Sequence, residues 1–321
     1  MRYYFAPMEG LTGSLFRKVH HAIFPGADRY YTPFISPTAE HVFTAREQRE
    51  IVPDIARGIP LVPQLLTKNA RDFLWAARSL RELGYEEVNL NLGCPSRTVT
   101  AKGKGSAMLG DPDALEVFLD EVFAGAEGLR ISVKTRIGVR DAAEFDRLLR
   151  IYGQYPICEL IIHPRTAGEM YRGLAHREVF ADAMEKTSLP LCYNGDIAVP
   201  EDTAGAAKQF PGLEAVMIGR GAVTNPALFR QLRGGPGLTK AELHAFHDAL
   251  YAGYREQFDD RIAMKKMKEL WAYLLFSFTG REAYIRPLRK ASRLEEYEAV
   301  VQRLFLEQDV IPGGAFDPNN L

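Results

Sequence analysis

One short stretch of the chain has the residue types of a reaction centre. Asn89 and Asn91 precede Cys94, which lies in a Gly-Cys-Pro turn. A thiol in such a turn can act as a nucleophile, a metal ligand or a proton donor. No other Cys or His stands at metal-ligand spacing, and a nucleophilic Cys needs a His base, which His163 provides only if the fold brings it close. Proton donation needs only proximity to the acceptor and a thiol pKa not far above ambient pH.

Further residues with ligand-binding chemistry follow the other apolar runs of the sequence. They are Pro7, Met8, Gln64, Lys134, His163, Arg165, Asn194, Gly195, Asp196, Gly219 and Arg220. Each residue alone is a weak signal. The repeated appearance of amides, cations, a His and a Cys at the ends of successive runs predicts one shared site, provided that the fold brings those ends together.

Two features suggest the kind of ligand. Glycines beside Asp196 and Arg220 let the backbone approach a phosphate, and Arg220 adds a charged fork, although glycines can also serve only tight turns. Gln64 and Lys134 suit a planar, heteroatom-rich ring such as a flavin. An amide matches its donor–acceptor edge, and a Lys cation stabilises the N1–C2=O region that becomes anionic on reduction. Taken alone, Lys134 could also be an ordinary charge at a strand end.

The elements that must position these residues alternate between β-type runs and amphipathic helical stretches. The apolar runs are Tyr3–Ala6, Tyr30–Ile35, Ile59–Leu66, Glu87–Leu92, Ile131–Thr135, Leu160–His163, Leu189–Tyr193 and Ala215–Ile218. Helical spacing marks Ala70–Leu83, Pro112–Ala124, Ala142–Tyr152 and Pro200–Phe210. This alternation predicts parallel strands with right-handed crossovers. Eight units have the size of an α/β (β/α)8 TIM barrel, in which functional side chains lie at the carboxyl ends of the strands.

An open doubly wound sheet is the alternative to the barrel. It would need a G-x-G-x-x-G turn after the first strand, but the sequence there is Ala-Pro-Met-Glu-Gly. The pattern changes at Arg233-Gly-Gly-Pro-Gly237, a cluster of breaker residues. Beyond it, Thr239 and Glu242 have the spacing of a helix-capping box, and no β-type run follows. We therefore expect a barrel domain over residues 1–235 and a domain of three to five helices over 236–321.

The overall composition is typical of a globular protein, with 46% hydrophobic and 25% charged residues. It argues against disorder, a collagen-like chain and a disulfide-stapled miniprotein. A formal charge of −1 excludes a chain coated in positive charge. Three cysteines cannot build a disulfide framework. Because neither a signal-peptide run nor a membrane-spanning run is present, we expect a cytoplasmic protein.

Positive charge is concentrated in one part of the helical region. Between Arg261 and Arg293, nine Lys or Arg residues stand against two Glu, a net charge of +7. A solvated helix face is one interpretation of such a run, and contact with an RNA phosphate backbone is the other. Trp271, Tyr273 and Tyr284 lie among these cations. They would either stack on bases or belong to the core.

Short motifs follow one another along nearly the whole chain. They are Ala6-Pro-Met-Glu-Gly-Leu-Thr12, Pro63-Gln64-Leu65, Asn89-Leu-Asn-Leu-Gly-Cys-Pro-Ser96, Gly105-Ser-Ala-Met-Leu109, Val133-Lys-Thr-Arg136, His163-Pro-Arg-Thr166, Asn194-Gly-Asp-Ile197 and Ile218-Gly-Arg-Gly-Ala222 with Asn225-Pro226. In order and spacing they resemble the tRNA-dihydrouridine synthases, flavin-dependent enzymes that reduce uridine in RNA to 5,6-dihydrouridine. The resemblance implies that a C-terminal helical domain docks beside the barrel and helps to hold RNA.

The resemblance also implies a role for each matching position. FMN would lie at the barrel mouth among Pro7, Met8, Gln64, Lys134, His163, Asn194, Gly195, Asp196, Gly219 and Arg220. NADPH would reduce the FMN, hydride would pass to C6 of a uracil flipped out of the RNA, and Cys94 would protonate C5. The substrate side would comprise Asn91 at the uracil edge, Arg165 nearby, Lys102 and Lys104 on a mobile loop, and, more loosely, Lys265 and Lys268 of the helical domain.

The expected partners are tRNA and NADPH, with no metal, no membrane and no obligate protein partner, so that the chain would act as a monomer. Two lysines, Lys102 and Lys104, replace the single basic residue usual in the family loop, and Met170-Tyr-Arg-Gly-Leu matches the family only partly. These differences leave the modified uridine open. Alternatives are a flavin barrel acting on a free pyrimidine, as the dihydroorotate dehydrogenases do, a non-catalytic RNA-binding protein, and a dihydrouridine synthase acting on ribosomal RNA.

Overall fold

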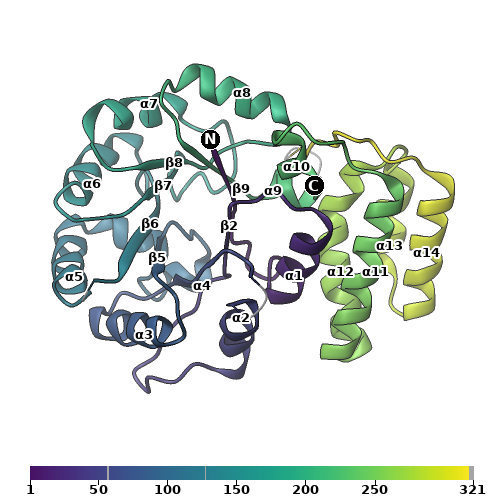
Figure 1. The fold of residues 1–321 in the computed structure, drawn as a ribbon, viewed down its shortest axis with the longest axis horizontal. Helices are drawn as coiled ribbons and strands as arrows, with labels where there is room; N and C mark the ends of the chain where they lie inside the picture. The colour runs from purple at the N-terminus through teal and green to yellow at the C-terminus, as the bar shows by residue number, and fades with distance from the viewer. Residues whose placement is uncertain (56–57, 127, 318–321) are drawn as a thin grey trace.

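The structure is a computed structural model of the 321-residue chain and describes residues 1–55, 58–126 and 128–317. Parallel strands form a nearly closed barrel surrounded by helices (Figure 1), which confirms the predicted (β/α)8 fold. Their order in space is β3-β2-β1-β9-β8-β7-β6-β5-β4. The strands are β1 (Arg2–Phe5), β2 (Arg29–Tyr31), β3 (Leu61–Val62), β4 (Gln64–Leu65), β5 (Glu87–Leu92), β6 (Arg130–Arg136), β7 (Leu160–His163), β8 (Leu191–Tyr193) and β9 (Ala215–Ile218).

The barrel closes through a proline. The predicted third run is divided at Pro63 into β3, which pairs with β2, and β4, which pairs with β5. Proline has no N–H to donate to a ladder, but the Pro63 carbonyl still accepts a 2.8 Å hydrogen bond from the Asn89 N–H. One predicted strand therefore becomes two short ones, and the count rises from eight to nine within the described residues.

Prolines also shorten two other predicted strands. The second run was expected to extend to Ile35, but β2 ends at Tyr31, before Pro33, and Ile35 returns only as an isolated bridge to Leu65. The seventh run was expected to begin at Leu189, but β8 begins after Pro190. In each case the missing N–H of the proline limits the hydrogen-bonded ladder, at the end of β2 and at the start of β8. The carboxyl end of β8 lies at Tyr193, as predicted.

Helices return the chain between successive strands, as Figure 1 shows. They are α1 (Ser14–Ile23), α2 (Ala45–Ile55), α3 (Ala70–Glu82), α4 (Arg97–Thr100), the 3-10 turn η1 (Gly105–Gly110), α5 (Pro112–Ala124), η2 (Ala142–Glu144), α6 (Phe145–Tyr152), α7 (Arg177–Lys186), α8 (Pro200–Gln209), α9 (Arg220–Thr224) and α10 (Leu228–Leu232). The Asp111 side chain accepts from the Ala114 N–H and caps α5, with Pro112 in its first turn, as predicted. The stretch predicted as one helix over 142–152 is divided into η2 and α6.

The region after residue 236 is helical. It comprises α11 (Lys240–Gln257), α12 (Asp260–Leu274), the 3-10 turn η3 (Leu275–Ser277), α13 (Glu282–Lys290) and α14 (Leu294–Glu307). Thr239 and Glu242 form the predicted capping box at the start of α11. On the right of Figure 1, these helices stand beside α1 and α9 of the barrel. No helix within the described ranges combines the length and apolarity needed to cross a membrane.

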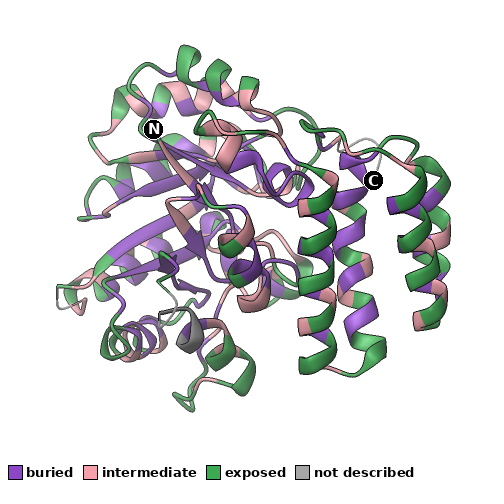
Figure 2. Ribbon diagram, turned by 45° about the vertical axis from the view of Figure 1, so that its right-hand side comes forward, coloured by how far each residue is buried: buried purple, intermediate pink, exposed green. Residues whose placement is uncertain are grey.

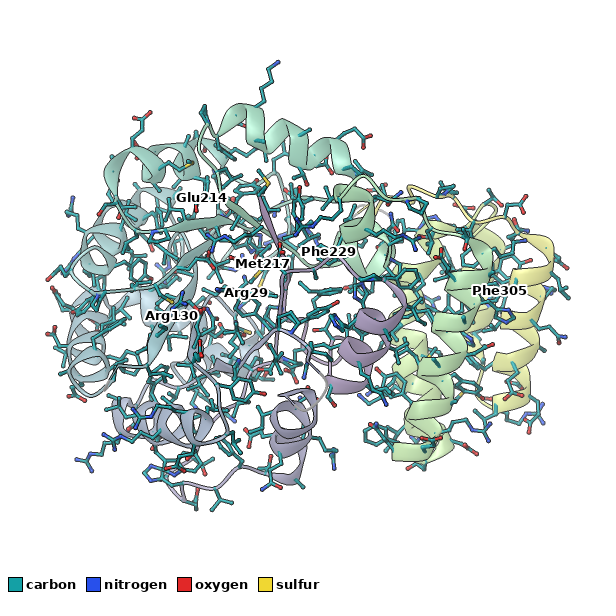
Figure 3. All side chains as sticks on the ribbon, viewed as in Figure 1. Arg29, Arg130, Glu214, Met217, Phe229 and Phe305 are labelled. Atoms are coloured by element: carbon teal, nitrogen blue, oxygen red, sulfur yellow. The ribbon has the colours of Figure 1, made fainter. Side chains whose placement is uncertain are left out.

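Buried aromatic rings join the barrel to the helical region. Phe16 of α1 packs edge-on against Phe246 of α11, with ring centroids 5.5 Å apart. Phe5 of β1 contacts both Phe16 and Phe229 of α10, the latter labelled in Figure 3. Figure 2 shows that buried residues cover the strands and the inward faces of these helices. The hydrophobic core is therefore continuous across the seam, because all four rings belong to one cluster of buried residues.

Candidate functional site

The residues predicted from the sequence meet at the carboxyl ends of the strands. The register places Asn91 of β5 beside Lys134 of β6, and Arg136 of β6 beside His163 of β7. At the other junction, a Cβ at Gly219 would lie 3.5 Å from the Met8 sulfur, which places the loop after β9 against the loop after β1. The barrel mouth therefore brings together side chains that are far apart in the sequence.

A chain of buried amides supports the cysteine loop. Asn91 donates through Nδ2 to Gln64 Oε1 at 2.7 Å, and Gln64 Nε2 donates to Asn89 Oδ1 at 2.8 Å. Asn89 Nδ2 then donates to the Ser132 hydroxyl at 3.0 Å. At the other end of the chain, Asn91 Oδ1 accepts from the Cys94 N–H at 2.9 Å. The amides expected to contact ring and base thus also fix the turn that carries the thiol.

Cys94 is a partly buried thiol in a cationic environment. Burial raises its pKa above the ordinary cysteine value, while the Ser96 backbone N–H and the Arg136 charge act in the opposite direction. Arg136 is itself buried and donates through Nε to the Gly93 carbonyl at 3.0 Å. The thiol is therefore protonated at neutral pH, as a proton donor must be, and positive charge lies nearby to stabilise the thiolate that remains.

Lys134 presents an amine to the barrel mouth without a partner among the described residues. No hydrogen bond or ion pair joins its Nζ to another described side chain or carbonyl. Burial, reinforced by the Arg136 charge, lowers its pKa to about 8. Because an unpaired buried ammonium is unfavourable, this position is suited to an anionic or electron-rich group of a ligand.

His163 is held as a neutral imidazole. Its Nε2 lies 3.1 Å from Arg165 Nη1, and because a guanidinium can only donate, Nε2 must accept. Burial lowers the pKa of His163 far below its usual range, and the charges of Arg136, Lys134, Arg165 and Arg220 act in the same direction. The proton of the ring therefore resides on Nδ1, and the imidazole does not serve as an acid at neutral pH.

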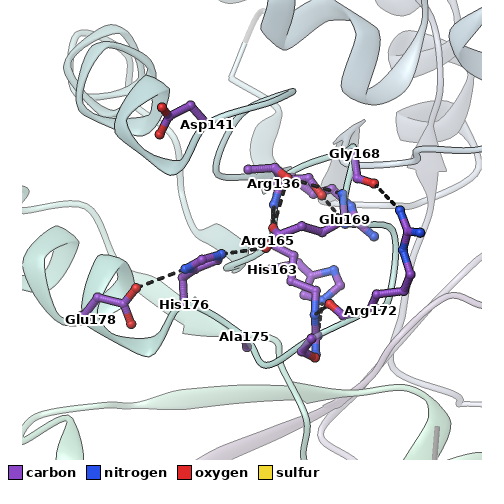
Figure 4. Close-up of polar contacts among 12 residues, drawn as sticks. Arg136, Asp141, His163, Arg165, Gly168, Glu169, Arg172, Ala175, His176 and Glu178 are labelled. Carbon is purple, nitrogen blue, oxygen red and sulfur yellow. Dashed lines mark hydrogen bonds and ion pairs between the residues drawn. The ribbon is translucent and has the colours of Figure 1, made fainter. Parts of the chain in front are cut away.

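The loop between β7 and α7 is fastened by Arg165. Figure 4 shows this group of contacts. Arg165 donates through Nη2 to the Gly173 carbonyl at 2.7 Å and to Asp196 Oδ2 at 2.6 Å. Near the end of the loop, Glu169 Oε1 lies 2.7 Å from His176 Nε2. Arg165 was predicted to lie near the substrate, and it does lie at the mouth, but its guanidinium is occupied by bonds within the protein.

The loops after β8 and β9 form the end of the site expected to bind phosphate. Asp196 has a left-handed backbone, with φ at 46°, and its Oδ1 accepts from Arg220 Nη2 at 3.2 Å. Asn194 is tied to the Met217 carbonyl through Nδ2 at 2.8 Å. A Cβ at Gly195 would lie 3.0 Å from the hydroxyl of a neighbouring tyrosine. The backbone is therefore closely packed on its inner side, and Arg220 stands over it as the charged group.

A phosphorylated planar cofactor fits this arrangement. Lys134 offers an amine that no other described residue binds, and Arg220 stands beside the glycines of the loops after β8 and β9. A ring of cations around neutral His163 makes the mouth electropositive. This donor set matches a dianionic phosphate at one end and an electron-rich ring at the other. In contrast, no group of three or more potential metal ligands gathers anywhere in the described part of the chain.

The predicted RNA contacts differ in their availability. Lys102 is exposed, and Lys104 donates to the Ser36 hydroxyl at 2.8 Å. Lys265 is well exposed, whereas Lys268 donates to the Ala291 carbonyl at 2.8 Å. The aromatic residues of the basic segment belong mostly to the core: Trp271 and Tyr284 are buried, and Tyr273 is half-buried.

Three residues at the mouth were not singled out from the sequence. Arg136 was noted only as part of a strand-end motif, yet it anchors the cysteine loop. Tyr171 lies under the guanidinium of Arg136 at 5.3 Å and of Arg220 at 5.0 Å. The ring of Phe316 also lies under the guanidinium of Arg220, at 4.8 Å. The strand-end position could have identified Arg136, and Tyr171 lies in the Met170-Tyr-Arg-Gly-Leu segment that was noted only as a partial family match, whereas no local pattern marks Phe316.

The fold and the site define the class of TIM-barrel proteins with a cationic mouth at the carboxyl ends of the strands. Within that class, the sequence profile of the dihydrouridine synthase (Dus) family matches residues 4–307. The chain therefore belongs to the dihydrouridine synthase family and is an oxidoreductase.

Curated relatives cover nearly the whole chain. A probable tRNA-dihydrouridine synthase of Staphylococcus aureus (strain Mu50) is 28% identical over 317 residues, covering 95% of this chain and 93% of the relative. The tRNA-dihydrouridine(16) synthase of Aquipseudomonas alcaligenes is 26% identical over 309 residues, covering 92% and 97%. That of Ralstonia nicotianae is 29% identical over 239 residues, covering 71% and 72%.

Solved structures share the barrel. Morphinone reductase superposes with a TM-score of 0.52 at 14% identity, covering 73% of this chain and 86% of its own. A 2-naphthoyl-CoA reductase gives a TM-score of 0.56 at 11% identity, covering 73% and 50%. At this level of identity the likeness concerns the fold alone.

Proposed function

We propose that the protein reduces a uridine of tRNA to 5,6-dihydrouridine, with FMN as bound cofactor and NADPH as electron donor. The observation that carries this proposal is the position of Cys94. Asn91 and Arg136 hold the backbone of the turn that carries its protonated thiol, and the amine of Lys134, unpartnered among the described residues, lies in the same mouth. The family, and the names of the relatives that span nearly the whole chain, support tRNA as the substrate class.

The proposed cofactor site uses the two ends of the mouth. Arg220, with Asn194 to Asp196 and Gly219, would hold the phosphate of FMN, and Pro7, Met8, Gln64, Lys134 and His163 would surround its ring. Bound FMN supplies the hydride that reaches C6 of the uracil. Lys134 brings the positive charge that an electron-rich ring requires, and its amine is mostly protonated below its pKa of about 8.

The protein's own residues would complete the reduction by delivering a proton. Cys94 holds the proton for C5 of the uracil, because burial keeps its thiol protonated. After transfer, the thiolate would be stabilised by the charge of Arg136 and by the backbone N–H of Ser96. Asn91 is only 7% exposed and keeps the turn in place through its bonds to Gln64 and the Cys94 N–H, and the second N–H of its amide would meet the uracil edge.

Proposed RNA contacts lie on both sides of the mouth. The helical domain of residues 236–321 would contribute Lys265 and Lys268, and the loop after Cys94 would contribute Lys102 and Lys104. Of these, Lys102 and Lys265 are exposed enough to meet a phosphate without rearrangement. We propose that the protein acts as a monomer, because the described residues of one chain provide both the barrel mouth and the basic segment between Arg261 and Arg293.

Reoxidation of the pre-reduced protein tests this function. The bound flavin is reduced with NADPH under argon, RNA lacking dihydrouridine is added, and the flavin spectrum is followed while the RNA is digested for mass spectrometry. We expect reoxidation coupled to new dihydrouridine in tRNA, including a readout at position 16, for which two relatives are named. Reoxidation by orotate but not by RNA would favour the free-pyrimidine reductase, and dihydrouridine only in ribosomal RNA would change the substrate.

The role of Cys94 is tested with a matched pair of variants. Cys94→Ala should retain FMN and NADPH oxidation but slow dihydrouridine formation by about 100-fold or more, which is the size of a general-acid contribution. Cys158→Ala removes another partly exposed thiol, one that precedes β7 at the opposite end of the barrel, and should leave the rate unchanged. Full activity of Cys94→Ala on RNA would exclude the thiol as proton donor.

A further inference from the structure

The C-terminal segment beyond α14 returns to the barrel. Ile311 donates its N–H to the Ser277 carbonyl at 2.8 Å, and the Pro312 carbonyl accepts from Gln231 Nε2 of α10 at 2.9 Å. Ser277 in turn donates its hydroxyl to the Thr224 carbonyl at the end of α9, at 2.7 Å. The segment is thus tied both to the helical region and to the loop region that follows β9.

These bonds direct the ring of Phe316 to the phosphate end of the mouth. The ring is only 9% exposed, although it lies close to the end of the described chain. It stacks on Tyr273 of α12, with centroids 5.5 Å apart, and contacts Phe276 of η3 at 5.3 Å. On its remaining side it meets the guanidinium of Arg220, whose central carbon lies 4.8 Å from the ring centroid.

Arg220 therefore contacts two aromatic rings. Its central carbon lies over the ring of Phe316, 4.8 Å from the centroid, and over the ring of Tyr171, 5.0 Å from the centroid. Its Nη2 is held at 3.2 Å by Asp196. Within the described residues, its other two nitrogens have no hydrogen-bond partner. A guanidinium that is held by two ring contacts and one hydrogen bond, with two nitrogens left for a ligand, is prepared for a bidentate phosphate contact.

We infer that Phe316 is a positioning residue that orients Arg220 toward the phosphate of the cofactor, so that the C-terminal segment sets cofactor affinity. The inference rests on the proposed function, because it requires FMN as the ligand. Its physical basis is the attraction between a cation and the face of an aromatic ring, together with the smaller rotational freedom left to the arginine. At a site as enclosed as this one, the attraction corresponds to about a threefold to thirtyfold change in affinity.

The experiment measures the FMN dissociation constant of the apo-protein by quenching of flavin fluorescence. Phe316→Leu retains an apolar side chain of similar size but has no aromatic face, and Phe316→Tyr retains the face. We expect the leucine variant to bind FMN about threefold to thirtyfold more weakly than the wild type, and the tyrosine variant to bind it within about twofold. Ile311→Ala, a truncation of a partly exposed residue of the same segment, is the matched control and should bind FMN normally.

A double-mutant cycle shows whether Phe316 acts through Arg220. In an Arg220→Ala background, Phe316→Leu should have no further effect on FMN affinity. An equal loss in both backgrounds, or unchanged affinity in Phe316→Leu alone, would overturn the inference while leaving the proposed function intact. Failure of the wild-type apo-protein to bind FMN would instead refute the proposed function. Thermal melting of each apo-protein verifies that the compared variants are equally folded.

Discussion

Asn91 connects the cysteine turn to the interior of the barrel, and its replacement tests that connection quantitatively. In Asn91→Ala, the oxygen of Gln64, a residue only 1% exposed, loses its donor, and the Gly93 and Cys94 N–H groups lose their acceptor. An orphaned buried acceptor costs about 1–3 kcal/mol, and each of the other two bonds contributes about 0.5–1.5 kcal/mol. We expect a loss of about 3 kcal/mol, which at roughly 2 °C per kcal/mol for a chain of this size lowers Tm by about 6 °C.

Asn91→Asp should behave differently, because the amide chain can reverse. The new carboxylate still accepts from the Cys94 N–H. It can also accept from Gln64 if that amide rotates, after which Gln64 accepts from Asn89, and Asn89 accepts from the Ser132 hydroxyl. A hydroxyl can donate as well as accept, so every bond is regained. The fall in stability should therefore be much smaller than for alanine.

Thermal melting of the apo-proteins decides between these outcomes. Ser132→Ala removes the hydroxyl at the end of the chain and leaves one group of the Asn89 amide without its partner, the N–H in the original orientation and the oxygen in the reversed one. Asn91→Asp combined with Ser132→Ala should therefore match the sum of the two single changes to within about 0.5 kcal/mol. If Asn91→Ala and Asn91→Asp have the same Tm, or if the double variant is much less stable than the sum of the two single changes, the amide chain does not reverse in the way described.

Three further predictions concern other parts of the molecule. At Gly221, an added Cβ would lie 2.8 Å from the Cα of Ala198 and closer still to a backbone carbonyl, so Gly221→Ala should lower the free energy of unfolding in urea by at least about 1–3 kcal/mol. Gly205 lies on the exposed face of α8, and Gly205→Ala should raise the free energy of unfolding by about 0.5–1 kcal/mol. The opposite order would refute this packing. The hydrogen bond with the Glu169 carboxylate raises the pKa of His176. The stability that this bond contributes is therefore complete below the pKa of His176 in the unfolded chain, and is lost as pH rises through the higher pKa of the folded protein. The Tm difference between wild type and His176→Gln should be larger at pH 6 than at pH 9, and a difference that does not change with pH would contradict this reasoning. Arg220→Ala should weaken FMN binding by about tenfold or more, as measured by flavin content after purification, and unchanged occupancy would argue against its phosphate role.

Much of the fold could be predicted because it depends on local pattern. Alternating runs and amphipathic stretches identified the barrel, and cap residues such as Thr239 and Asp111 marked helix starts correctly. The errors concern strand lengths. Pro33 and Pro190 lie inside predicted strands, and Pro63 divides another. A proline removes a ladder donor whatever its neighbours, so these limits could have been recognised by weighting proline above apolarity.

The sequence predicted only those residues of the candidate site that lie at the ends of strands. Reading the ends of strands identified Gln64, Lys134 and His163, which the barrel brings together. The partners of those residues were less visible, because hydrogen bonds and ring contacts depend on tertiary structure. Phe316 is the clearest case: it follows Arg220 by nearly a hundred residues and contacts it only because the C-terminal segment returns across the seam.

The continuous aromatic seam between α1, α10 and α11 has a consequence for recognition. Because Phe16, Phe229 and Phe246 belong to one buried cluster, the helical region cannot tilt against the barrel without opening the core. The orientation of the basic segment, Arg261–Arg293, relative to the barrel mouth is therefore fixed. If the proposed function holds, the protein keeps its shape on binding and the RNA must deform to fit it. The uridine that reacts is then the one that reaches the barrel mouth at the lowest cost in RNA deformation energy.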